Sequence, residues 1–204
     1  MPLTTFEEEI YLRALTGRIV GKALSDLGLN KVAVVAPKNI ICSSIAAATE
    51  ASFLDYSGGV TRHFMIELGE NEAEIAKRIK DFDAEALVLQ FGGESPIEEV
   101  KKSFVKLLKA LAEEQVSGAL VIHVRIFAAG GLKEALLDEN IKSFIKERPV
   151  FVYTVDFDNG KVYVNKAEIV DSEVKLKKIK EYQVTLEHAD LLNRSLKDRR
   201  IAFQ

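Results

Sequence analysis

Two segments of the sequence place small, hydroxyl or thiol residues where a ligand could bind. The first runs from Pro37 to Ser44 and carries Cys42, Ser43 and Ser44. Backbone N–H groups at the start of a helix attract anions, so we expect a phosphate or carboxylate where these side chains open a helix. Cys42 is also a candidate nucleophile. The alternative is a small buried thiol beside two capping hydroxyls, because no Cys-His pair is visible in the sequence.

The second segment is formed by Gly92, Gly93, Glu94 and Ser95. Its two glycines let a backbone approach a ligand closely, and the Glu94 carboxylate could hold a hard cation. The alternative is a tight turn followed by a Ser95 cap. The segment matches neither the GxGxxG pattern of dinucleotide-binding loops nor the P-loop, because no Gly-Lys-Ser/Thr follows.

A third glycine-containing segment and the histidines define no site. Residues 127–131 offer a permissive backbone but no side-chain chemistry, which favours a plain connection into a helix. His123 stands inside an apolar run and is expected to be a core imidazole. His188 is expected on an exposed helix face. The histidines show no metal-binding spacing, so no metal site is predicted.

The order of predicted elements places these segments. Short apolar, β-branched runs are typical of strands buried on both faces of a parallel sheet. They are predicted at residues 32–36, 86–90, 119–126 and 150–153, with a partly alternating strand at 60–68. Helical periodicity predicts helices at 6–27, from Ser43 to about 51, from Asn71 to about 79, from Ser95 to 111, and at 132–145. The first is expected to start at a Thr5–Glu8 capping box, the third at an Asn71 cap and the fourth at a Ser95 cap.

This alternation predicts a three-layer α/β fold with a mainly parallel sheet and helices on both faces. In such sheets ligands bind beyond the carboxyl ends of the strands, where the three segments are expected. Asp158-Asn159-Gly160 is a hairpin signal. We therefore expect a single domain over residues 1–204, in which about 150–204 form an antiparallel extension and a C-terminal arm, including a helix at 186–196. The path of residues 171–204 is not legible.

Composition excludes several classes of protein. The chain has 204 residues, 28 Lys+Arg against 31 Asp+Glu, a net charge of −3 and one Cys. A mildly acidic chain lacks the basic footprint of a general nucleic-acid binder, and one Cys cannot build a disulfide framework. No apolar stretch is long enough to span a membrane, and no signal-peptide pattern is present, so a soluble, cytoplasmic protein is expected. A charged fraction of 29% is compatible with a thermophilic source.

The loop order of residues 32–131 resembles the thiamine-diphosphate-binding domain of 2-oxoacid:ferredoxin oxidoreductase β subunits. The run from Ile40 to Ser44 is similar to that family's Gly-Ile-Gly-Cys-Ser turn, and Gly92 to Ser95 is similar to its Gly-Gly-Asp-Gly turn. The chain departs from the family where the Cys-x-x-Cys is absent, Glu94 replaces the magnesium-binding Asp, and Val124 replaces a metal-binding Asn. The resemblance implies the fold, and a relative that has lost magnesium and thiamine diphosphate.

Two functions follow from these observations. The first is a non-catalytic or regulatory protein that binds a small anionic ligand at Cys42 to Ser44 and Gly92 to Ser95. It would act as a homo-oligomer or a partner subunit. The alternative is an enzyme that uses a thiamine-diphosphate-type or nucleotide cofactor on a small acid. The absence of a recognisable acid–base constellation favours the first. The sequence identifies neither the ligand nor any cofactor.

Overall fold

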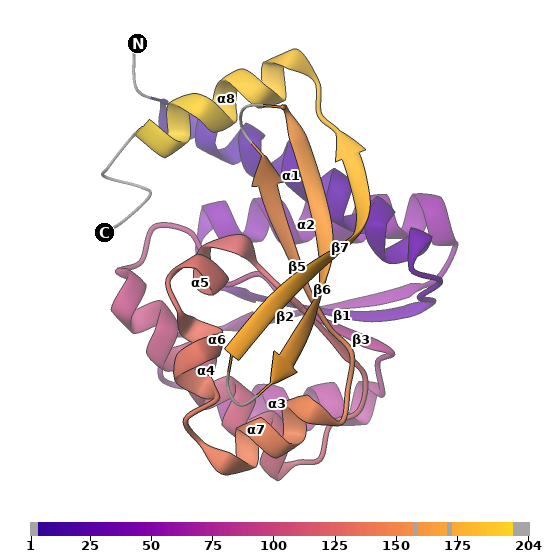
Figure 1. Ribbon diagram of the computed structural model, residues 1–204, viewed down its shortest axis with the longest axis vertical. Coiled ribbons are helices and arrows are strands. Elements are labelled where there is room, and N and C mark those ends of the chain that lie inside the picture. Colours follow the sequence, from indigo (N-terminus) through magenta and orange to yellow (C-terminus); the bar gives the residue numbers. More distant parts are fainter. Residues whose placement is uncertain (1–3, 157–158, 171–172, 198–204) are drawn as a thin grey trace.

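In a computed structural model, which describes residues 4–156, 159–170 and 173–197, a seven-stranded sheet runs through the protein (Figure 1). Its strand order is β2-β1-β3-β4-β5-β6-β7. β1 to β5 are parallel, while β6 and β7 continue the sheet antiparallel. The strands are β1 (Lys31–Pro37), β2 (Val60–Ile66), β3 (Ala86–Leu89), β4 (Ala119–Ile122), β5 (Val150–Asp156), β6 (Lys161–Val170) and β7 (Glu173–Gln183). The predicted sheet with its antiparallel extension is confirmed.

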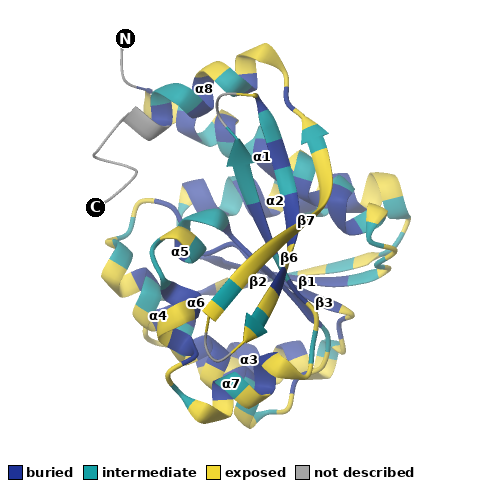
Figure 2. Ribbon diagram, in the orientation of Figure 1, coloured by how far each residue is buried: buried dark blue, intermediate teal, exposed yellow. Residues whose placement is uncertain are grey.

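Helices cover both faces of this sheet, which also confirms the three layers. One hydrophobic cluster packs α3, α4, α6 and α7 on one face, and another packs α1 and α2 on the other. Figure 2 shows the buried central strands between them. Along β1, Val32 and Val34 enter one cluster while Ala33 and Val35 enter the other. The helices are α1 (Phe6–Asp26), α2 (Ile40–Ser57), α3 (Glu72–Phe82), α4 (Ile97–Glu113), α5 (Val124–Ala128), α6 (Gly131–Ala135), α7 (Glu139–Lys146) and α8 (Leu186–Lys197).

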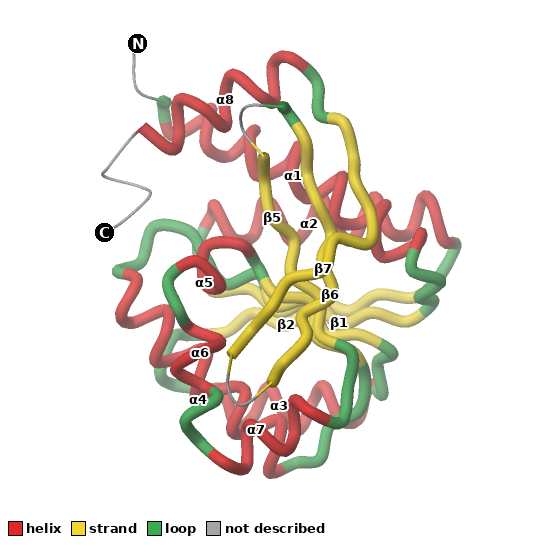
Figure 3. Tube along the Cα trace, viewed as in Figure 1, coloured by secondary structure: helices red, strands yellow, loops and turns green. Residues whose placement is uncertain are grey.

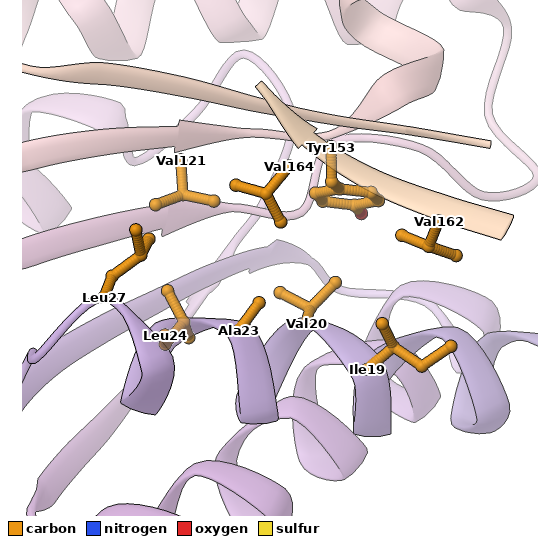
Figure 4. A pocket seen from close by; sticks show the side chains of 9 residues that line it. All are labelled: Ile19, Val20, Ala23, Leu24, Leu27, Val121, Tyr153, Val162 and Val164. Carbon is orange, nitrogen blue, oxygen red and sulfur yellow. The ribbon is translucent and has the colours of Figure 1, made fainter. Parts of the chain in front are cut away.

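The helix α1 packs against β4, β5 and β6, where the parallel part of the sheet meets the antiparallel part. Figure 4 shows its apolar side chains facing those of β4, β5 and β6 across a small cavity. Val20 and Leu24 project from the helix, and Val121 and Val162 from the strands. The lining is apolar apart from the Tyr153 hydroxyl, which bonds to Gln90. This contact therefore supports the fold and offers no polar group to a ligand.

The predicted capping box at the start of α1 is confirmed. The Glu8 backbone N–H donates to Thr5 Oγ1 at 3.2 Å, and the Thr5 N–H donates to Glu8 Oε2 at 2.8 Å. We expect Thr5→Ala to lower the free energy of unfolding by about 1 kcal/mol, the usual cost of losing such a cap. Urea denaturation measures the loss. Thr5→Ser, which keeps the acceptor, serves as the control, and an equal loss in both variants would contradict the prediction.

Three predicted helix starts need correction. The cap of α2 is Asn39, whose Oδ1 accepts from the Cys42 N–H at 2.8 Å, so Ser43 and Ser44 lie inside the helix and cap nothing. The cap position of α4 is Pro96, one residue after the predicted Ser95, and no side-chain bond caps it. Asn71 does stand at the start of α3, but its Oδ1 accepts from the Glu67 N–H instead of the helix.

The predicted strand at 119–126 is also wrong in its second half. β4 ends at Ile122, and residues 124–128 turn into the short helix α5, followed by α6 and α7 (Figure 3). His123 caps α5, because its Nδ1 accepts the Arg125 N–H at 3.0 Å. His123 is therefore a strand-end residue, and the segment 127–131 contains the end of α5 and the start of α6.

The C-terminal arm folds back on α1. Arg194 of α8 donates to both carboxylate oxygens of Glu8, at 2.9 and 2.7 Å. His188 is 2% exposed, which corrects the exposed face expected for it. Among the described residues, no helix has the length and apolarity needed to cross a membrane. Residues named in the sequence analysis that lie outside the described ranges are Asp158 of the turn signal and the ends of the arm at 171 and 198–204.

Candidate functional site

The strand order reverses between β1 and β3. The chain passes from β1 outward to β2 and then returns to β3 on the other side of β1. The two following loops diverge to opposite faces, which leaves a crevice at the carboxyl ends of both strands. A methyl group placed on Gly93 would lie 2.7 Å from Cys42 Sγ and 2.8 Å from Asn39 Oδ1. The first two predicted segments therefore meet at this crevice, whereas the third, at 127–131, does not follow a strand.

The first loop presents the beginning of α2. Cys42 is buried, and burial raises the pKa of its thiol, so it stays protonated at neutral pH. Ser43 and Ser44 are half-buried, and Ser44 Oγ donates to the Ile40 carbonyl at 2.8 Å. The N–H groups at the first helical positions, Ile40 and Ile41, have no intrahelical acceptor and can bind an anion.

The second loop is held by an arginine that sequence reasoning missed as a site residue. Gly92 and Gly93 are buried, Ser95 is half-buried and Glu94 is exposed. Gly93 has φ +80°, which a side chain rarely adopts. The Arg125 guanidinium donates to the Gly93 carbonyl and to the Ser95 carbonyl, the latter at 3.4 Å. The loop is thus fixed from the neighbouring strand end.

His123 lies over this loop as a neutral imidazole. A methyl group on Gly92 would lie 3.1 Å from His123 Cε1. Burial, and then the positive charges of Arg13 and Arg125, lower the His123 pKa to about 3. The ring meets Tyr153 edge-on, with ring centres 5.2 Å apart.

A second missed residue, Arg13, brings positive charge from α1. Its guanidinium pairs with Glu9 at 3.2 Å, and Glu9, fully buried, accepts from the Thr4 hydroxyl at 2.5 Å. The charge of Arg13 also lowers the pKa of Arg125, after burial. Both guanidinium groups therefore act on the same strand ends. The only sequence signal was a charged pair on the inner side of an amphipathic helix.

Three buried polar side chains, Tyr153, Gln90 and Thr49, form a hydrogen-bond network beneath the loops. Tyr153 Oη donates to Gln90 Oε1 at 2.6 Å, and Gln90 Nε2 donates to Thr49 Oγ1 at 3.2 Å. Thr49 in turn donates to the Ile45 carbonyl at 2.7 Å. Every member has a partner, so this network fixes the end of β3 rigidly.

A polar cleft of about 280 Å³ adjoins the loops on the β2 side. Asn39 and Ser95 line it, and an ion pair of 2.8 Å between Lys38 and Glu67 lies along it. Asn39 therefore borders both this cleft and the contact with Gly93. The cleft therefore gives room for a small molecule beside Asn39 and Ser95, at one side of the crevice.

Comparisons with known proteins bear on the fold. A family model described as "Uncharacterized protein" matches residues 9–191. No curated protein matches the sequence. A solute-binding protein of an ABC transporter from Rhodopseudomonas palustris, in complex with 4-hydroxybenzoate, has a TM-score of 0.57 at 13% identity, covering 86% of this chain and 66% of that one. A putative branched-chain amino acid ABC transporter from Rhodospirillum rubrum has a TM-score of 0.51 at 16% identity, covering 70% and 37%.

A further solute-binding protein, from Rhodopseudomonas palustris BisB5 in complex with 3,4-dihydroxybenzoic acid, has a TM-score of 0.55 at 13% identity and covers 86% and 66%. At these identities the likeness shows the fold alone, a periplasmic-binding-protein-like α/β fold. This chain spans 66% or less of the length of the three neighbours.

These neighbours correct the resemblance to thiamine-diphosphate-binding domains, which is wrong. The order of strands and loops that carried it is shared by many doubly wound α/β proteins, so it did not identify one family. At the two positions compared with the metal ligands of that family, Val124 begins the helix α5 and the Glu94 side chain is exposed. The thiamine-diphosphate enzyme is therefore set aside.

Proposed function

The chain belongs to the family described as uncharacterized protein, whose model matches residues 9–191, and from its fold and site we propose that it binds a small carboxylic acid without converting it. The observation that carries this proposal is that, after the larger effect of burial, which raises the pKa of Cys42, the positive charges of Arg13 and Arg125 both lower it, in the first turn of α2 at the crevice between β1 and β3. Positive charge in a partly buried site favours an anion strongly, because water screens it little.

The predicted residues retain a place in this proposal. The first turn of α2, which includes Cys42, Ser43 and Ser44, would offer N–H groups to the anion. The loop from Gly92 to Ser95 would close over it through its backbone. Because the Cys42 thiol is buried and protonated, its role in the proposal is packing and not nucleophilic attack.

The neighbours support an aromatic acid as the ligand class. Three solute-binding proteins from R. palustris hold 3,4-dihydroxybenzoic acid, 4-hydroxybenzoate and benzoate. In this chain Ile40, the first residue of α2, is 58% exposed beside the same loops. It would offer an apolar contact to a ring whose carboxylate reaches the guanidinium groups.

The proposal predicts that Asn39→Asp weakens binding of benzoate and 4-hydroxybenzoate at least tenfold. Asp caps a helix as well as Asn does, so the fold is kept, while the new negative charge repels the carboxylate. Calorimetric titration measures the affinity, and the ligand-induced rise in melting temperature checks it independently.

Asn30→Asp is the matched control. It makes the same change of charge just before β1, at the opposite end of that strand, and should bind as the wild type does. If no carboxylate stabilises the wild type, the proposed function is wrong. If Asn39→Asp binds normally, the ligand lies elsewhere.

Three expectations from the sequence stay predictions: a single domain, a cytoplasmic location, and a homo-oligomer or partner subunit. Light scattering over a range of concentrations tests self-association, for which a concentration-independent monomer would be the contrary result.

A further inference from the structure

We propose that His123 helps to recognise the ligand by donating a hydrogen bond from its Nε2–H group to one of the ligand's oxygen atoms. The inference rests on the proposed function and deepens it, because it adds a hydrogen-bond requirement to the requirement for negative charge. It follows from the tautomer of the ring, from a donor that has no partner among the described residues, and from the rigid placement of the ring.

The tautomer is set by the cap of α5. A backbone N–H can only donate, so the bond of 3.0 Å from Arg125 N to His123 Nδ1 requires a lone pair on Nδ1. In the neutral ring the proton then resides on Nε2. The low pKa of His123, about 3, supports a neutral ring throughout the physiological range. Nε2 is therefore a donor and not an acceptor.

This donor has no partner within the described part of the chain. His123 is only 6% exposed, yet its one hydrogen bond is made by Nδ1. Nε2 itself is not sealed inside the protein, so it still reaches solvent. A ligand oxygen in the crevice would therefore replace a water molecule on this donor, and no side chain of the described residues competes for it.

The ring is held where a ligand in the crevice can reach it. A methyl group on Gly92 would lie 3.1 Å from His123 Cε1 and 3.5 Å from each ring nitrogen, which places the ring against the second loop at the strand ends. Tyr153 braces the ring edge-on, and its hydroxyl is itself fixed by Gln90. The donor is thus pre-organised, and a ligand that presents a donor or a cation at this point should be rejected.

Two variants separate this role from the structural role of the cap. In His123→Asn, Oδ1 can replace Nδ1 as the acceptor of the Arg125 N–H, but the Nε2 donor is lost. In His123→Gln, the longer amide restores a donor near the Nε2 position. We expect the asparagine variant to bind benzoate at least tenfold more weakly than the wild type, and the glutamine variant to recover most of the loss.

Melting without ligand controls for folding, and nitrogen-15 NMR of the imidazole gives a readout of the tautomer that needs no ligand. The inference predicts a protonated Nε2 and a bare Nδ1, with the Nε2 proton shifted when benzoate binds. A protonated Nδ1 would overturn it. So would wild-type affinity in the asparagine variant while the wild type binds benzoate, an outcome that leaves the proposed function standing. If the wild type binds no carboxylate, the proposed function fails and this inference with it.

Discussion

Gly21→Val is expected to lower the free energy of unfolding by about 3 kcal/mol or more, at the upper end of what overpacking a core costs. A Cβ at Gly21 would lie 2.3 Å from the Thr49 carbonyl oxygen and 2.7 Å from Phe53 N, and one at Gly17 would lie 2.5 Å from the Ile45 carbonyl oxygen. The obstacles are backbone atoms of α2, which no rotamer change can move. Valine therefore forces α1 and α2 apart.

Urea denaturation measures this loss, and Arg18→Val is the matched control. Arg18 is exposed on the same helix, so valine there tests β-branched helix propensity without the helix contact. We expect the control to lose about 0.5 kcal/mol. Equal losses at both positions would show that close contact of the two helices is not what stabilises α1.

The same contact connects the fold to the proposed site. Arg13 lies on α1, and the packing of α1 against α2 determines how near its guanidinium group lies to the strand ends. We infer that the glycine pair serves binding indirectly, since it sets the distance between the helix that brings the charge and the helix that offers its first N–H groups.

Local patterns in the sequence were enough to predict the sheet. Runs such as Val32 to Ala36 combine β-branched and small apolar residues over a short length, which is typical of a strand covered by helices on both faces. Hydroxyl and carboxylate spacing likewise predicted the start of α1 at Thr5 and Glu8. The same reasoning brought Cys42 and Gly93 to one edge of the sheet, because loops that follow parallel strands share that edge.

Local patterns failed where distant residues decide the conformation. Val124 and Ile126 are β-branched and read as strand, yet the cap from His123 turns this segment into α5. Arg13 and Arg125 do not stand out in the sequence, because the effect of each charge on the other depends on how two helices pack around the sheet. His188 carried no sign of burial, since the helix that covers it is far away in the chain.

Acid is expected to destabilise the protein as the pH falls from about 6.5 toward 4, because two histidines are buried in the neutral form. Burial, and then the charge of Arg13, lowers the pKa of His188 to about 4, and that of His123 is about 3. An unfolded histidine has a pKa near 6.5, so below that pH the unfolded chain takes up protons that the folded protein does not. This stability is therefore complete above pH 6.5 and is lost as the pH approaches the folded values.

The expected loss is on the order of 3 kcal/mol per histidine at pH 4. His188→Gln removes one of the two titrations, while its amide can keep a bond to the Thr16 hydroxyl, now 3.1 Å from His188 Nε2. Urea midpoints of wild type and variant, measured from pH 7 to 4, should converge as the pH falls. Carboxylates titrate alike in both proteins, so the difference isolates His188. Parallel curves would mean that this imidazole is already protonated in the folded protein, or that it is not buried.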